Sequence, residues 1–316
     1  MQAYIARRLI AVPFMLFGMS LLLFWLLFLR PGNAALTGFG LVSPDQNAQA
    51  IASLEEEFGL DKPFFVQYGK WAWNALQGDF GISLKNRRPV TPEIRSRLPV
   101  TAELGLLTVL LTAVIGLPVG IISAIRPGTF LDGLLRIVTI SGISVPNFWV
   151  ATLVITLPAI WWAWTPLWEY VRFEDDPINN LKIVIWPAVT LAIATAAYVA
   201  RIVRSSMLET LYSDYVRTAR AKGLRERAVV LRHVFRSSMI AVITVIGIQL
   251  GAVLGGSVIA EQIFGIPGLG LLVFESVVSI DYTVALAAIM VFAFMFTIVN
   301  LVVDVSYTFV DPRIRY

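Results

Sequence analysis

Residues 104–125 read LGLLTVLLTAVIGLPVGIISAI, and no charged side chain interrupts this run. A helix rises 1.5 Å per residue, so about 20 such residues cross a hydrocarbon core about 30 Å thick. A helix also satisfies its own backbone hydrogen bonds, which lipid requires of any open-ended segment. The run therefore predicts a membrane-spanning helix.

Five more uncharged runs of similar character lie on either side of this one. They cover residues 9–29, 137–164, 183–200, 239–260 and 282–303. The chain is 57% apolar and 15% charged, whereas soluble domains are about 45–50% apolar and about 25% charged. We therefore predict an all-α integral membrane protein with six transmembrane helices. Kinks are expected at the prolines of these runs, namely Pro13, Pro118, Pro146, Pro158 and Pro187.

The first run could instead be a secretory signal, because Arg7 and Arg8 precede it. Its apolar stretch is longer than the about 7–15 residues typical of such signals. We therefore expect an uncleaved first helix.

The charges of the connections predict the orientation. Residues 201–236 carry a large excess of Lys and Arg, whereas residues 165–182 and 261–281 are mainly acidic. Basic loops remain in the cytoplasm, so 201–236 is predicted to be cytoplasmic and the two acidic connections external. Six spans then place both termini in the cytoplasm, which agrees with Arg7, Arg8, Arg313 and Arg315 near the ends.

Several kinds of chemistry are excluded. There is no cysteine for a disulfide or thiolate site, and the single histidine, His233, is too few for a triad or a histidine zinc site. No lysine is followed by Ser or Thr, so the chain has no P-loop. The net charge of +4 comes without basic runs interleaved with aromatics, which disfavours nucleic acid. We predict no catalytic residue, no metal and no cofactor in this chain.

Carboxylates inside the membrane would suggest an ion-coupled secondary carrier. Glu103, Glu261 and Asp304 are the candidates, and all three lie near the ends of the uncharged runs. We expect them at the membrane interface rather than in a proton relay.

Residues 214–223 read DYVRTARAKG within the basic connection. Ala219 and Ala221 are small, and Gly223 permits a sharp turn with positive φ. The pattern predicts two short helices that meet at Gly223 and form a compact knob, although an ordinary basic loop remains an alternative.

This stretch resembles the cytoplasmic loop of binding-protein-dependent ABC importer permeases, whose motif is Glu-Ala-Ala, three residues, then Gly. Aligned on Gly223, the motif's Glu falls on Arg217 and its alanines on Thr218 and Ala219, a departure that is typical of the peptide-importer branch. The resemblance implies a coupling helix that docks on an ATPase subunit. The residues implied are Asp214, Tyr215, Arg217, Ala219, Ala221, Lys222 and Gly223.

Four other segments, in order along the chain, resemble the dipeptide and oligopeptide importer permeases that have a large external segment after the first helix. They are residues 59–83, 97–101, 255–270 and 304–316. The resemblance implies the type I ABC importer permease fold, with a small external segment between helices 1 and 2. Its expected parts are 1–30 as cytoplasmic N-terminus and helix 1, 31–99 as external segment, 100–316 as permease core, and 204–237 as coupling loop.

The implied function is half of a translocation pathway for di- or oligopeptides in the cytoplasmic membrane of a prokaryote. The implied partners are a second homologous permease, two cytoplasmic ATPase subunits that use ATP and Mg, and an extracytoplasmic substrate-binding protein. Nickel chelates, glutathione or oligosaccharides are alternative substrates of the same branch. An ion-coupled carrier, a membrane enzyme and an exporter are the rival classes.

Glycine and proline at membrane depth suit irregular backbone that lines a cavity. The expected external gate comprises Glu261, Phe264, Pro267, Gly268 and Gly270. A second set of glycines is expected to let helices pack closely: Gly247, Gly251, Gly255 and Gly256.

Overall fold

The computed structural model describes residues 2–28, 62–83, 85–166 and 169–310. Residues 31–61 of the expected external segment, together with Arg313 and Arg315, lie outside these residues. In the described part of the chain, regular structure is helical, and one isolated antiparallel bridge joins Ile82 to Pro89. The predicted all-α class is confirmed.

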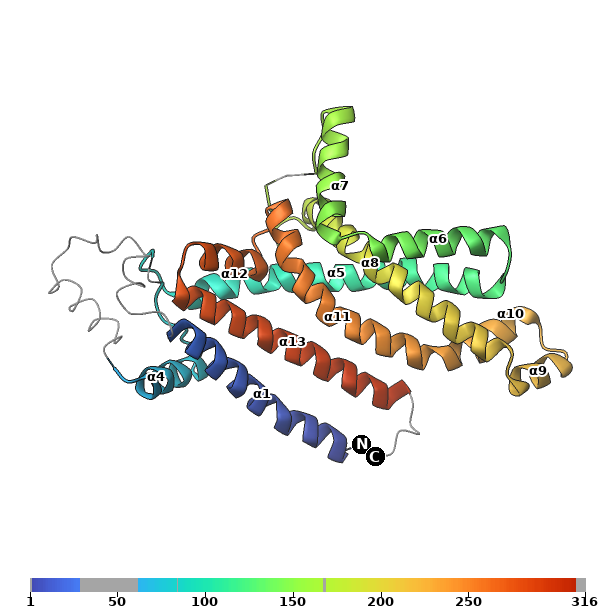
Figure 1. Ribbon diagram of the computed structural model, residues 1–316, viewed down its shortest axis with the longest axis horizontal. Coiled ribbons are helices and arrows are strands. Elements are labelled where there is room, and N and C mark those ends of the chain that lie inside the picture. The colour runs from blue at the N-terminus through green and yellow to red at the C-terminus, as the bar shows by residue number, and fades with distance from the viewer. Residues whose placement is uncertain (1, 29–61, 84, 167–168, 311–316) are drawn as a thin grey trace. The chain divides into compact units, whose positions relative to one another are not determined.

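The helices follow one another along the chain as labelled in Figure 1. They are α1 Gln2–Phe28, α4 Phe64–Leu76, α5 Val90–Ile125, α6 Phe130–Ser144, α7 Asn147–Trp162, α8 Pro177–Leu211, α9 Asp214–Ala221, α10 Glu226–Ala228, the π-helix η1 Val229–Phe235, α11 Arg236–Phe264, α12 Leu269–Val278 and α13 Tyr282–Val310.

Among the described residues, α1, α5, α8 and α13 are each long and apolar enough to cross a membrane. The number rises to at most seven when each bent pair of helices is taken as one span. The six predicted spans fall within that range. Helix α5 starts at Val90, well before the uncharged run at 104 that predicted it.

The third predicted span is not one helix. Its residues form the end of α6 and all of α7, which meet at an angle of 101° (Figure 1). The break lies at Val145, whose extended φ of −87° and ψ of 126° suit a residue before proline, and Pro146 follows it. The kink that was expected at Pro146 is therefore a break between two helices. Helices α1, α7 and α8 continue through Pro13, Pro158 and Pro187.

The chain divides into two compact units. Unit 1 contains the described residues of 2–5, 101–266 and 298–310. Unit 2 contains the described residues of 6–100 and 267–297. Each unit has its own buried apolar core.

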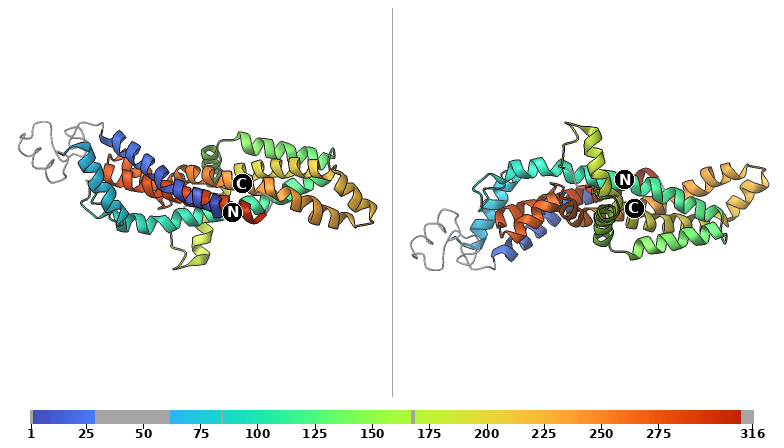
Figure 2. Two further views of the ribbon diagram at one scale, coloured as in Figure 1. Left: turned by 90° about the horizontal axis from the view of Figure 1, so that it is seen from below. Right: turned by 90° about the horizontal axis from the view of Figure 1, so that it is seen from above.

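Helix α8 is the centre of unit 1. It runs between α6 and α11 in both Figure 1 and Figure 2, and most of its apolar span is buried. On a further side, α5 crosses it closely at Gly116 and Gly120. A Cβ added at Gly120 would lie 2.6 Å from the carbonyl oxygen of Ala200 and 2.6 Å from the Cβ of Val203. Small residues four apart therefore let these two helices approach.

This crossing was not predicted, and the expected glycines of α11 contribute unequally. A Cβ at Gly247 would collide with Val303, and one at Gly256 would lie 3.2 Å from Leu191. Gly255 faces open space instead. Close packing is thus confirmed for Gly247 and Gly256, whereas for Gly251 it stays a prediction.

Unit 2 joins the start of α5 to α12 and α13. Val90, Ile94, Leu269 and Val284 belong to one buried cluster. The Ser83 hydroxyl donates a hydrogen bond to the Asp281 carboxylate, and Arg97 forms ion pairs with Glu93 at 3.1 Å and with Glu275 at 3.4 Å. In the same unit, α1 contacts α4 through a 2.8 Å hydrogen bond between the hydroxyls of Ser20 and Tyr68.

Candidate functional site

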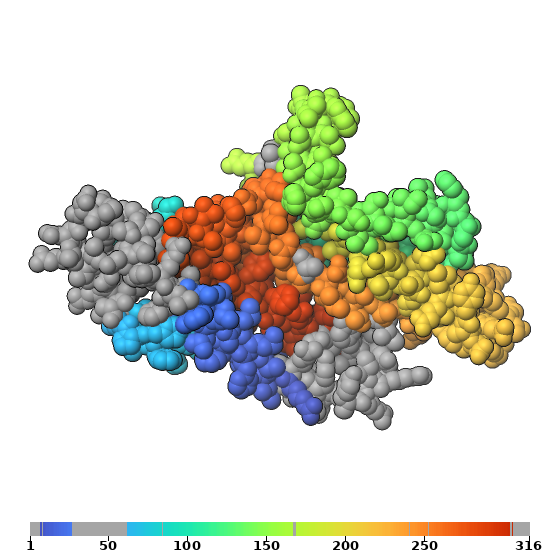
Figure 3. All heavy atoms as spheres, viewed as in Figure 1, coloured from blue at the N-terminus to red at the C-terminus, as the bar shows by residue number. Residues whose placement is uncertain are grey.

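The basic segment predicted to form a knob projects from one end of unit 1. We call residues 212–228 the knob. It contains α9 and α10 and follows the end of α8 (Figure 1), and in Figure 3 its yellow and orange atoms protrude at the right. The expected pair of short helices around Gly223 is therefore present.

Local sequence explains where α9 begins and ends. Asp214 lies in its first turn and Arg220 in its last, which complements the helix dipole. After Lys222 the chain turns at Gly223, whose φ is 73°. The Gly223 N–H donates to the Arg220 carbonyl at 2.9 Å. The predicted positive φ at this glycine is confirmed.

Helix α9 has one buried face and one exposed face. Val216 is fully buried and Ala219 is 7% exposed, and both pack in a cluster with Met207, Val229 and Val230. The other residues implied by the resemblance are exposed: Asp214, Tyr215, Arg217, Ala221, Lys222 and Gly223. Ala219 therefore anchors the helix rather than facing outward.

Val216 shares that anchoring role and was missed by sequence reasoning. The signal was available, because Val216 and Ala219 are spaced i and i+3 in an otherwise polar helix.

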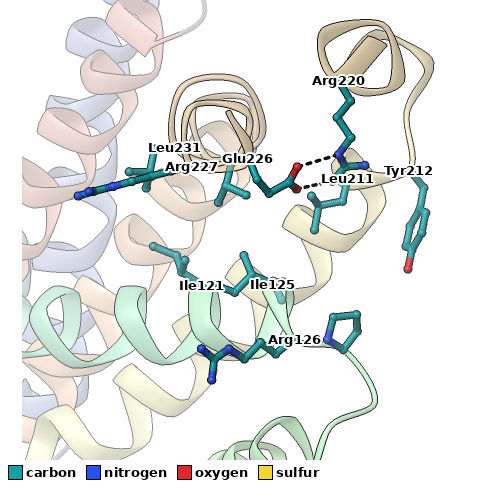
Figure 4. Close-up of a pocket in the computed structure, with 12 residues that line it drawn as sticks. Ile121, Ile125, Arg126, Leu211, Tyr212, Arg220, Glu226, Arg227 and Leu231 are labelled. Carbon is teal, nitrogen blue, oxygen red and sulfur yellow. Dashed lines mark hydrogen bonds and ion pairs between the residues drawn. The ribbon is translucent and has the colours of Figure 1, made fainter. Parts of the chain in front are cut away.

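The two sides of the knob are joined by an ion pair. Arg220 donates to the two carboxylate oxygens of Glu226 at 3.1 and 2.7 Å (Figure 4). Its guanidinium holds the pKa of the Glu226 carboxyl below the usual value. Because both side chains are substantially exposed, the pair orients the turn more than it stabilises the fold.

The knob continues directly from α8, and α8 is fixed by a buried carboxylate on α6. Asp132 accepts hydrogen bonds from the side chains of Arg204 and Ser123 and from the Gly128 backbone N–H. Sequence reasoning did not identify Asp132, because its partner Arg204 lies far away along the chain.

The predicted gate residues are divided between the two units. In unit 1, Glu261 is fully buried and accepts a 2.8 Å hydrogen bond from the Thr101 hydroxyl, and Phe264 is 4% exposed. Glu261 is therefore held inside the protein, and its expected position at the membrane interface stays a prediction. Gly265, with φ of 66°, ends α11 and donates to the Glu261 carbonyl.

In unit 2, Pro267 and Gly268 precede α12, and Gly270 lies in its first turn. The Gly268 carbonyl accepts from the Leu272 N–H at 3.1 Å. This helix was not predicted, because its residues were taken as part of an external connection.

Glu103, the other described carboxylate that was considered for a proton relay, lies beside two polar side chains. It accepts from Asn180 at 3.3 Å and Tyr170 at 3.5 Å. Burial and the neighbouring Glu103 carboxylate raise the pKa of Tyr170 to about 12. Tyr170 thus remains a donor at neutral pH, which suits a structural contact.

Sequence comparison gives one family over most of the chain. The model of the "Binding-protein-dependent transport system inner membrane component" family matches residues 116–316, and the model of its N-terminal part matches residues 1–105.

Curated relatives match over their full length. A putative peptide transport system permease protein of Brucella abortus is 38% identical, and the dipeptide transport system permease protein DppB of Alkalihalophilus pseudofirmus is 36% identical. The glutathione transport system permease protein GsiC of Escherichia coli K12 is 38% identical. Each alignment covers 100% of this chain and 100% of the relative.

Solved structures share the fold at low sequence identity. A chain of the inward-facing MetNI methionine ABC transporter aligns with a TM-score of 0.57 and 18% identity, covering 69% of this chain and 96% of that one. A chain of an amino acid ABC transporter aligns with a TM-score of 0.52 and 14% identity, covering 71% and 95%.

Proposed function

The chain belongs to the family of binding-protein-dependent transport system inner membrane components, and from this membership we propose that it imports peptides as one half of a translocation pathway. It is a permease subunit of the ABC importer class with the type I fold, and the ATPase of such a system is a separate subunit. The family implies ATPase and substrate-binding partners and an inner-membrane location.

One observation carries the peptide assignment. Relatives named as peptide and dipeptide permeases align with the whole of this chain and over the whole of their own length. The glutathione permease has the same 38% identity as the first of them, so glutathione is the second candidate.

The test is the ligand of the substrate-binding protein that works with this permease. That protein is purified without added ligand, and the bound molecule is released and identified by mass spectrometry. Di- or oligopeptides are expected. Recovery of glutathione alone selects the second candidate, whereas a nickel chelate or an oligosaccharide contradicts the peptide assignment.

We also propose that the exposed face of α9 docks on an ATPase subunit. Its support is the division of the helix into two faces, since Val216 and Ala219 fix it to unit 1 while Tyr215, Arg217 and Lys222 remain accessible. The chain passes from α8 into α9, so a displacement of the docked helix would move α8 as well. Rocking of the helix bundles would then open the translocation pathway to one side of the membrane at a time.

The proposed assembly has two unlike permeases, two ATPase subunits and an external binding protein. The proposed orientation has the knob and both termini in the cytoplasm, and it is supported by the excess of Lys and Arg in residues 201–236. The proposed parts remain 1–30, 31–99, 100–316 and the coupling loop 204–237. Residues 90–99 are the first turns of α5, so the proposed external segment ends within that helix.

The external gate also remains a proposal. In unit 1 it is supported by Glu261, a fully buried carboxylate held by Thr101, next to the buried ring of Phe264. In unit 2 it is supported by the irregular backbone of Pro267 and Gly268 before α12.

A further inference from the structure

A pocket of about 470 Å³ lies in unit 1 between the end of α5 and the knob (Figure 4). Its size falls within the range of about 300–1,000 Å³ that is usual for small-molecule sites. Its walls come from α5, the turn after it, the end of α8, the knob and η1.

The pocket has an apolar floor. Ile121 and Ile125 of α5 face Leu231 of η1 across it, and Val230 of η1 also lines it. Ile125 and Leu231 are 43% and 47% exposed, so this floor is accessible to a hydrocarbon chain.

The rim of the pocket is cationic. Arg220 is paired with Glu226, so its charge is neutralised. The guanidinium groups of Arg126 and Arg227 have no hydrogen-bonding or ion-pair partner among the described residues. In Figure 4 the Arg126 and Arg227 side chains point away from the Arg220–Glu226 pair and diverge from each other, with Ile121 between them.

The position of the pocket along α5 indicates its level relative to the membrane. Arg126 directly follows the uncharged run of residues 104–125, and the first charge after such a run marks the membrane–water interface. With the knob in the cytoplasm, as the proposed function has it, the pocket lies at the headgroups of the inner leaflet.

We propose that this pocket binds an anionic phospholipid of the inner leaflet, with its headgroup at the rim that carries Arg126 and Arg227 and an acyl chain over Ile121, Ile125 and Leu231. A basic pocket beside apolar helix surface at the cytoplasmic interface suits such a headgroup. The bound lipid connects the end of α5 to η1, next to the docking helix, and thereby supports the coupling of ATP hydrolysis to transport.

An acidic side chain of the ATPase subunit is the competing occupant. It matches the two arginines but leaves the exposed apolar floor uncovered, whereas a lipid matches both. The charge pattern together with the exposed isoleucine and leucine therefore favours the lipid.

The test uses the complete importer in nanodiscs of phosphatidylcholine, with phosphatidylglycerol titrated in as the probe. Spin-labelled phosphatidylglycerol reports binding, and ATPase activity stimulated by the binding protein reports coupling. The test variant is R126Q/R227Q. The matched control is R136Q/R201Q, which removes two exposed arginines of α6 and α8 that lie outside both the coupling loop and the pocket lining.

The wild type and the control are expected to retain labelled phosphatidylglycerol, and stimulated ATPase activity rises with its content. R126Q/R227Q is expected to bind it about 30-fold more weakly, which corresponds to about 1 kcal/mol per arginine at an anionic surface. Inorganic phosphate at millimolar concentration is expected not to displace the lipid.

Equal lipid binding by R126Q/R227Q and the control overturns the proposal, and so does displacement by inorganic phosphate. Loss of ATPase subunits from R126Q/R227Q in pure phosphatidylcholine identifies the competing occupant and also overturns it. Lipid binding is read independently of peptide transport. An importer that binds the lipid but carries no peptide therefore contradicts the proposed substrate and leaves the lipid site standing.

Discussion

Arg204 of α8 donates two hydrogen bonds to the carboxylate of Asp132 of α6, from Nε at 2.8 Å and from a terminal nitrogen at 2.9 Å. The Asp132 side chain is 2% exposed and that of Arg204 is 23% exposed. Ser123 donates to the same carboxylate at 2.5 Å and the Gly128 N–H at 3.0 Å. The turn between α5 and α6 is thereby fastened to the helix that leads into the knob.

Replacement of Asp132 by Asn is expected to destabilise the protein, because it leaves the Arg204 charge without its partner. Breaking one side of a buried pair costs up to about 3–5 kcal/mol. Thermal unfolding of the purified permease measures this. Arg136→Gln, an exposed site on the same helix, is the control and should change stability by less than about 0.5 kcal/mol. If D132N and R136Q have the same melting temperature, the Arg204–Asp132 pair does not stabilise the fold.

Replacement of Gly120 by Ala is expected to lower stability by about 1–3 kcal/mol, the usual cost of overpacking. The added methyl would lie 2.6 Å from the Ala200 carbonyl oxygen, so α5 and α8 must separate. Gly133→Ala on α6 meets nothing within 4 Å and is the matched control. It is expected to be neutral or stabilising because alanine favours helix. Equal melting temperatures for the two variants would show that the crossing is not tight.

Replacement of Gly223 by Val is expected to leave the protein in the membrane but to uncouple ATPase activity from substrate. The left-handed backbone at φ of 73° costs a β-branched residue about 1–2 kcal/mol, so the turn after α9 is reshaped. Gly78→Val is the control, because Gly78 has φ of 81°, also faces open space and lies far from the knob in sequence. The measurement is ATPase activity with and without loaded binding protein. Normal stimulation in G223V counts against the docking assignment.

The two faces of α9 are expected to respond differently to mutation. Val216→Ala removes buried volume and should lower the melting temperature, at about 0.8 kcal/mol per buried methylene plus a cavity cost. Arg217→Glu lies on the exposed face and should leave stability within about 0.5 kcal/mol while weakening binding of the ATPase subunit. Copurification of ATPase subunits with each variant measures the second effect. A stable R217E permease that retains its ATPase subunits normally would contradict docking through this face.

Local sequence predicted those features that depend on one segment alone. The uncharged runs predicted long apolar helices, and Gly223 predicted a positive-φ turn, because hydrophobic length and glycine each act within their own segment. The basic connection likewise predicted short helices at the knob.

The remaining features depend on partners that are distant in sequence. In the sequence, Arg204 is one of several basic residues of the connection 201–236. Its role is visible only in the fold, where its side chain donates a hydrogen bond to Asp132. The close packing of Gly116 and Gly120 could not be predicted, because it depends on their contact with the backbone of Ala196 and Ala200. The break at Pro146 was expected as a kink, but its angle of 101° depends on what α6 and α7 pack against.

Uptake of a labelled dipeptide into proteoliposomes distinguishes an ATP-driven peptide importer from an ion-coupled carrier. The liposomes contain this permease, its second permease and the ATPase subunits, with the loaded binding protein outside and ATP at the nucleotide-binding side. If the chain is a permease of an ATP-driven importer, uptake requires both ATP and the binding protein, and the G223V variant abolishes it. Uptake that proceeds without the ATPase subunits under an ion gradient would contradict this assignment.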